Sequence, residues 1–322
     1  MKLTTYTLNQ IGGRKNVEDS IYPASFQQGS PAVFVVCDGV GGSNHGEVAS
    51  QIASKMFYEA LAGKAIASKD QFEKIIRQTV VKFKDAVDAF VQENPAGNGT
   101  STTLTVAMIV GDLAYIAWCG DSKIYQIRNG NIHYRSLDHS LVAELVKQGV
   151  ITEEQAITHP QRNVITRSLS QHTKSTDVDV EVLSIKQGDW LLLCTDGLLE
   201  QFNEARFSSM LSIFQKGRNY AGDINAYCEG KTGDNYSMYL VHVDQVASKG
   251  GKGKTLLIIG LLIALIGGYL FYQQQSTDVS KQTLIKEKND GDTSNIPLLE
   301  LMNKKPDSSK KLSKEDSLLK DL

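Results

Sequence analysis

The stretch that most constrains the fold runs from Val33 to Ala49, where a run of apolar residues ends abruptly on an acid. Five apolar residues lead directly into Asp38, glycines follow, and apolar residues then recur at helical spacing. A short apolar run next to glycine is typical of a buried strand, and the later spacing is that of an amphipathic helix. A carboxylate at the end of a buried strand costs free energy unless it is paired or binds a metal. We therefore expect Asp38 to be a metal ligand between a strand and a helix.

The composition is that of a globular chain with a sizeable core. The 322 residues suffice for one large domain or two small ones, and 41% of them are apolar. The net charge of −2 gives no indication of nucleic-acid binding. Cysteines are few, scattered and never spaced as Cys-x-x-Cys, so we expect reduced core residues of a cytosolic domain rather than disulfides or zinc ligands. They are Cys37, Cys119, Cys194 and Cys228.

One segment, residues 255–272, is apolar throughout and carries no charge. At a rise of about 1.5 Å per residue it just spans a bilayer core of about 30 Å. The alternative, a buried core helix, would need a polar face, which the segment lacks. Lys249, Lys252 and Lys254 precede it, so the positive-inside rule predicts a cytoplasmic N-terminal domain and an external tail. We expect a single-pass protein of the inner (plasma) membrane.

These features divide the chain into four parts. They are a catalytic domain over residues 1–246, a Gly/Lys linker over 247–254, a transmembrane helix over 255–272 and a tail over 273–322. The tail is polar, lacks aromatic residues and is expected to be disordered. Gly260, Ala264 and Gly268 recur at every fourth position, which permits close helix packing and hence a dimer through the membrane helix.

Helices and strands are expected in blocks within the first domain. Predicted helices cover residues 47–61, 70–93, 141–147 and a short stretch after Thr152, and predicted strands cover 33–37, 101–110, 114–119, 123–128, 132–136, 178–183, 190–194 and 236–243. Blocks of this kind, without strict alternation, indicate an α+β fold with mostly antiparallel sheets.

Four aspartates share one pattern, since each lies at the end of an apolar strand with glycine beside it. They are Asp38, Asp121, Asp196 and Asp234. One such residue is usually part of a turn, whereas four are better explained by a shared site where strand ends converge. All-oxygen ligands select hard cations such as Mg²⁺ or Mn²⁺ over zinc.

The acids belong to short motifs whose order is more specific than any single motif. The series is Gly13-Arg14-x-x-x-Glu18-Asp19, Val36-Cys37-Asp38-Gly39-Val40-Gly41-Gly42, Gly99-Thr100-Ser101-Thr102-Thr103, Gly120-Asp121-Ser122-Lys123, Asp138-His139-Ser140, His159-Pro160, Thr195-Asp196-Gly197 and Gly233-Asp234-Asn235. Together these motifs resemble the metal-dependent Ser/Thr protein phosphatases of type 2C in their bacterial form, over residues 4–244. Lys123 and Ser237 stand where the family usually has Arg and Thr.

The resemblance implies a four-layer α-β-β-α sandwich of two antiparallel sheets flanked by helices, with metals at one end. It implies that Asp38 bridges two Mn²⁺ or Mg²⁺ ions, that the Gly39 carbonyl binds the first, and that Asp196 and Asp234 complete the second. Asp121 matches a position that, with the equivalent of Asp196, holds a third metal in bacterial members.

The resemblance also implies roles around the metals. Arg14 matches an arginine that binds the substrate phosphate, and Glu18 and Asp19 resemble outer acids that hold metal-bound waters. Residues 137–170 would form a flap beside the site, where substrates are selected. His45, His139 and His159 are expected to be hydrogen-bonded loop residues rather than ligands.

The resulting hypothesis is a membrane-anchored enzyme that hydrolyses phosphoserine and phosphothreonine. A hydroxide bridging two divalent metals would attack the phosphorus, and the enzyme would oppose a Ser/Thr kinase. One alternative is a catalytically weak relative that serves as a binding or signalling module. Another is that the outer tail regulates the phosphatase across the membrane.

Overall fold

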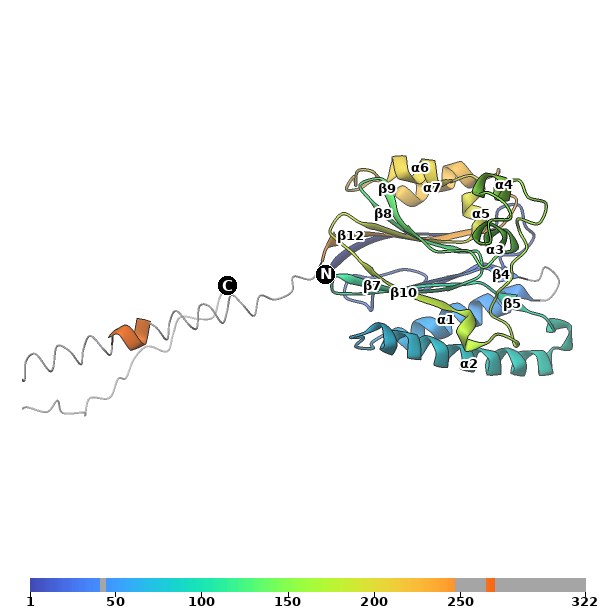
Figure 1. The fold of residues 1–322 in the computed structure, drawn as a ribbon, viewed down its shortest axis with the longest axis horizontal. Coiled ribbons are helices and arrows are strands. Elements are labelled where there is room, and N and C mark those ends of the chain that lie inside the picture. The colour runs from blue at the N-terminus through green and yellow to red at the C-terminus, as the bar shows by residue number, and fades with distance from the viewer. Residues whose placement is uncertain (41–44, 247–264, 270–322) are drawn as a thin grey trace, which may run out of the picture. The chain divides into compact units, whose positions relative to one another are not determined.

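The computed structural model describes residues 1–40, 45–246 and 265–269 (Figure 1). The chain separates into two compact units, Met1–Gly250 and Gly251–Leu322. Residues 265–269 of the second unit are helical. Within the described residues, no helix has the length and apolar character needed to cross a membrane. The rest of the predicted span, residues 255–264 and 270–272, and the predicted tail lie outside the described residues.

Two antiparallel sheets form the centre of the first unit. One sheet has the order β1-β12-β11-β8-β9, with β1 (Lys2–Gln10), β12 (Tyr236–Gln245), β11 (Trp190–Cys194), β8 (Lys123–Arg128) and β9 (Asn131–Arg135). The other has the order β10-β7-β6-β3-β2, with β10 (Asp179–Ser184), β7 (Leu113–Cys119), β6 (Leu104–Val110), β3 (Val33–Cys37) and β2 (Ser20–Tyr22). A short ladder joins β4 (Gly39–Val40) to β5 (Ser101–Thr102).

Helices cover the outer face of each sheet, so the unit has four layers (Figure 1). The long helices α1 (Gly46–Leu61) and α2 (Lys69–Glu93) lie on the second sheet, and α6 (Glu204–Met210) and α7 (Tyr220–Cys228) lie on the first. The short helices α3 (Leu141–Lys147), α4 (Glu153–Ile157) and α5 (Asp196–Leu199) gather at one end, near β4 and β5. Two 3₁₀ turns span Pro95–Gly97 and Ser175–Asp177. The predicted α-β-β-α sandwich is confirmed.

The apolar run before Asp38 is buried on both faces because β3 lies inside this sandwich. Val33, Val35 and Cys37 point toward α1 and α2, whereas Phe34 and Val36 point toward the other sheet. Alternate residues of a strand face opposite sides, so a strand covered on both sides is apolar throughout.

Most predicted elements are found with small shifts at their ends. The turn between β8 and β9 has positive φ at both Asn129 and Gly130, and Thr152 with Gln155 forms a capping box at the start of α4. β1 and β2 were not predicted from the sequence. β1 is an alternating, mostly polar edge strand without an apolar run, and β2 has only three residues. The position of β1 depends on antiparallel pairing with β12, from the far end of the domain.

The aromatic contact between the sheets provides a test of the sandwich core. Phe34 is fully buried, with its ring centroid 5.0 Å from that of Tyr239 on the opposite sheet. We expect Phe34→Ala to lower the free energy of unfolding by about 3–5 kcal/mol, because it leaves a cavity between the sheets. Urea denaturation would measure this loss. Val81→Ala on the exposed side of α2 should change stability by less than about 0.5 kcal/mol.

Candidate active site

The pairing register brings the predicted acids to one end of the sandwich. In the first sheet Cys194 pairs with both Lys123 and Met238, so the end of β11 lies beside the beginnings of β8 and β12. In the second sheet Cys37 pairs with Ser20, and Cys119 pairs with Leu104. The residues just beyond these strand ends are Asp19, Asp38, Asp121, Asp196 and Asp234. Strands from both sheets therefore place carboxylates at the same end of the sandwich.

The carboxylates are close enough to perturb one another. Burial raises the pKa of Asp38 well above its usual range, and the negative charges of Asp19, Asp196, Asp121 and Asp234 raise it further. Burial, together with the charges of neighbouring aspartates, raises the pKa of Asp19 and of Asp121 to about 7. Like charges held together in a partly dry site favour protonation unless a cation compensates them.

Two carboxylate oxygens in this cluster lack partners. The Oδ1 atoms of Asp19 and Asp196 are shielded from solvent and accept no hydrogen bond. Buried acceptors without partners are uncommon and cost free energy, whereas a divalent cation would satisfy them. The donor set therefore fits a hard cation such as Mg²⁺ or Mn²⁺.

The arrangement of these acids is open rather than a closed cage. Across the described ranges, no three His, Cys, Asp or Glu side chains form one group that could hold a metal. Mg²⁺ usually keeps several waters and takes only one or two carboxylates from the protein, so an open array is compatible with such an ion.

Threonines beside the acids fix their backbone and side-chain positions. The backbone N–H of Asp38 donates to Thr103 Oγ1 (2.9 Å), and its carbonyl accepts from Thr103 N (2.8 Å) and Thr102 Oγ1 (2.8 Å). Thr195 Oγ1 donates to Asp19 Oδ2 (2.9 Å) and accepts from the backbone of Ser237 (2.9 Å). Sequence analysis gave these threonines no role, although each belongs to a quoted motif.

Asn235 and Gly39 join the N-terminal acids to the rest of the site. Asn235 Oδ1 accepts from the backbone N–H of Glu18 (2.7 Å), and its amide donates to two carbonyls of the Arg14 loop. Gly39 donates to the Glu18 carbonyl (3.1 Å) and packs so tightly that a Cβ there would lie 2.5 Å from the Gly46 oxygen. Glycine is therefore required at this position.

Arg14 lies at the exposed side of the cluster and contacts Asp234. Its Nη2 atom is 2.5 Å from Asp234 Oδ2, and about half of its side chain is accessible to solvent. Burial lowers the pKa of Arg14, but the bond to Asp234 and the nearby acids outweigh this effect and raise it. Arg14 thus remains charged beside the acids and within reach of solvent.

The sequence of this chain matches a known protein family. Residues 11–222 match the family described as protein phosphatase 2C. The chain belongs to the protein phosphatase 2C family. The serine/threonine phosphatase stp of Listeria monocytogenes is 31% identical over 217 residues, which are 66% of this chain and 84% of that protein. The predicted enzyme class, a protein serine/threonine phosphatase of type 2C, is confirmed.

Solved structures of this phosphatase family agree with the fold. The serine/threonine phosphatase of S. agalactiae gives a TM-score of 0.67 at 29% identity, covering 75% of this chain and all of that one. The catalytic domain of PstP, solved in complex with two manganese ions, gives a TM-score of 0.63 at 26% identity over 74% of this chain and 97% of that one. Dependence on divalent metal ions follows from membership of the family.

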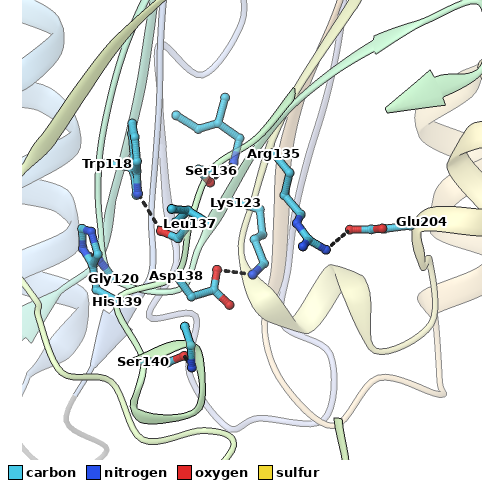
Figure 2. Close-up of polar contacts among 12 residues, drawn as sticks. Trp118, Gly120, Lys123, Arg135, Ser136, Leu137, Asp138, His139, Ser140 and Glu204 are labelled. Carbon is cyan, nitrogen blue, oxygen red and sulfur yellow. Dashed lines mark hydrogen bonds and ion pairs between the residues drawn. The ribbon is translucent and has the colours of Figure 1, made fainter. Parts of the chain in front are cut away.

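His139 of this phosphatase is a structural residue, as expected for a hydrogen-bonded loop histidine (Figure 2). Its buried ring accepts from the Gly120 N–H at Nδ1 (3.2 Å) and donates from Nε2 to Asp179 (3.1 Å). Burial lowers the pKa of His139, which keeps the ring neutral and able to accept at Nδ1. The ring also stacks on Trp118, so His139 holds the loop that carries Asp121.

The raised pKa values predict that metal stabilises this phosphatase more strongly as pH rises. Without metal, Asp19 and Asp121 keep protons in the folded state up to about pH 7, whereas in the unfolded chain their pKa is 3.8. Their contribution to stability is therefore complete below pH 3.8 and is lost as pH rises through about 7. Metal binding requires ionised carboxylates and offsets this loss.

Thermal unfolding with Mn²⁺ or with chelator, measured at several pH values between 5 and 8, would test this linkage. The gain in Tm from Mn²⁺ should grow with pH. The same gain should appear in Asp88→Asn, a change of an exposed acid on α2, and should shrink in Asp121→Asn. A gain that does not vary with pH would contradict the assignment.

Proposed function

We propose that this phosphatase hydrolyses phosphoserine and phosphothreonine in proteins at the Asp38 cluster. The observation that carries the proposal is the convergence of four aspartates around Asp38, two of them with buried oxygens that lack partners. Asp38, the Gly39 carbonyl, Asp196 and Asp234 would hold two Mn²⁺ or Mg²⁺ ions. Asp121, together with Asp196, would provide a third position. When bound, the cations supply charge for the phosphoryl oxygens and lower the pKa of water for in-line attack.

Arg14 would bind the phosphate of the substrate. A phosphomonoester is a dianion, and a guanidinium can donate to two of its oxygens at once. The position of Arg14 supports this role, because about half of its side chain is accessible to solvent beside the acid cluster. While Asp234 is its partner, Arg14 is held at the rim of the site.

Glu18 and Asp19 would be outer acids that hold waters bound to the metals. Asp19 is suited to this role because Thr195 fixes one of its oxygens and leaves the other unpaired. Glu18 is partly buried and tied through its backbone to Asn235 and Gly39. The alternative of a catalytically weak binding module is less well supported, because such relatives would be expected to lack some of these carboxylates.

We further propose that residues 255–272 anchor the enzyme in the inner (plasma) membrane. Their uncharged apolar sequence and the three preceding lysines support a cytoplasmic catalytic domain over residues 1–246 and an external tail over 273–322. Gly260, Ala264 and Gly268 recur at every fourth position, and this spacing supports a dimer through the membrane helix. The substrates would be proteins phosphorylated by a Ser/Thr kinase, together with the kinase itself.

Phosphate release from a phosphothreonine peptide tests the catalytic proposal. We expect release with Mn²⁺ or Mg²⁺ and none with excess chelator, because the carboxylates need a divalent ion to act. Asp38→Asn and Asp196→Asn should lose activity to the limit of detection. Asp88→Asn, the same chemical change at an exposed position, should retain it. Release that persists in chelator or in both site variants would overturn the proposal.

Membrane fractionation tests the anchor. The full-length chain should remain with membranes after a high-salt wash, because a transmembrane segment does not depend on charge for its binding. A chain ending at residue 246 should be recovered in the soluble fraction. External protease should remove only the tail of the full-length chain in spheroplasts. A full-length chain found in the soluble fraction would refute the membrane assignment.

A further inference from the structure

A cavity of about 680 Å³ opens directly beside the acid cluster. Asp121 and Asp196 form part of its wall, and the rest comes mainly from residues 136–167, including α3 and α4. Its volume lies within the usual range of ligand pockets, about 300–1,000 Å³. A molecule bound at the acid cluster would therefore extend into this cavity.

The wall of the cavity contains apolar side chains that the fold itself does not bury. Leu137 is 68% exposed and Ile157 is 71% exposed, and both line the cavity. Helix α4 buries none of its residues, and α3 buries only Val142. Exposed apolar surface gathered at one place is characteristic of an interaction site.

Three of the basic side chains that line the cavity already have partners within the protein. Figure 2 shows Lys123 directed at Asp138 and Arg135 directed at Glu204. Arg167 lies 3.7 Å from Asp179. At these three positions an incoming acidic group would have to compete with an existing ion pair, whereas an incoming apolar group would cover the exposed Leu137 and Ile157. The cavity thus favours an apolar occupant.

We propose that this cavity binds an apolar side chain of the substrate protein, close in sequence to the phosphorylated residue. The inference rests on the proposed function, because continuity with Asp121 and Asp196 is what makes the substrate chain the occupant. An extended chain advances about 3.3 Å per residue, so residues within three positions of the phosphate can reach the wall. Leu137, Val142, Val146 and Ile157 form the contact. The enzyme thereby selects phosphoserine or phosphothreonine flanked by Leu, Ile, Val or Phe.

A positional scan of phosphothreonine peptides tests the cavity. Each peptide carries one Leu at a position from −3 to +3 in an otherwise Ser/Gly background, and the reference peptide carries Ser throughout. The purified full-length enzyme is assayed with Mn²⁺ in mild detergent. We expect at least one position at which Leu raises kcat/KM about tenfold over the reference.

Two variants locate the effect in the cavity. Ile157→Ser should reduce the Leu-to-Ser ratio of kcat/KM to about one, and its exposed position means that folding should be unaffected. Val150→Ser is the matched control, because Val150 is 62% exposed in the same segment but does not line the cavity. This control should keep both the ratio and the activity of the wild type.

The possible outcomes separate the two proposals. A ratio of about one at every position in the wild type, or a tenfold ratio that survives Ile157→Ser, overturns the cavity proposal and leaves the phosphatase assignment intact. Absence of phosphate release from every peptide overturns both. Loss of the ratio in Ile157→Ser alone supports the cavity.

Discussion

The mutual repulsion of acids at one end of the sandwich is the constraint on which the rest of the structure depends. Burial raises the pKa of Asp38, and the negative charges of four other aspartates raise it further. Such a cluster disfavours its own charged state, so the fold must hold the acids together by other means. The free energy of folding that offsets this repulsion comes from the sheets and helices behind the acids, whose buried residues are mostly apolar. A divalent cation would turn the repulsion into attraction.

Two neighbouring parts of the molecule differ in how firmly they are held. The acids lie at the ends of strands, and Thr102, Thr103 and Thr195 fix Asp38 and Asp19. Residues 137–170 instead contain short helices with little buried surface. This segment is nevertheless tied to the site, because Leu169 pairs with Thr102 and the His139 N–H donates to the Gly120 carbonyl. The firmly held acids therefore lie beside an exposed surface, which we propose contacts the substrate.

The fold was predictable wherever local pattern and final environment agree. The apolar run of β3 and the apolar stripe of α2 (Phe72, Ile76, Val80, Phe83) are buried as their periodicity indicates. β1 was missed because its stability comes from pairing with β12 more than two hundred residues later, which no local pattern records. No helix was predicted between residues 204 and 228, where α6 and α7 lie. They are fixed by packing on the first sheet.

For the site, the sequence by itself determined which acids are present, that four of them lie at strand ends beside glycine, and that the order of the motifs resembles type 2C phosphatases. It also determined the uncharged apolar stretch at residues 255–272. Only the tertiary structure decided that the acids meet at one edge of the sandwich. It also decided that Asp19 and Asp196 each have a carboxylate oxygen without a partner, and that Arg14 forms an ion pair with Asp234. The same holds for the partners of His139 and for the cavity beside Asp121. Residue type is a local property, whereas distance, burial and pKa depend on strands that pair across the whole domain.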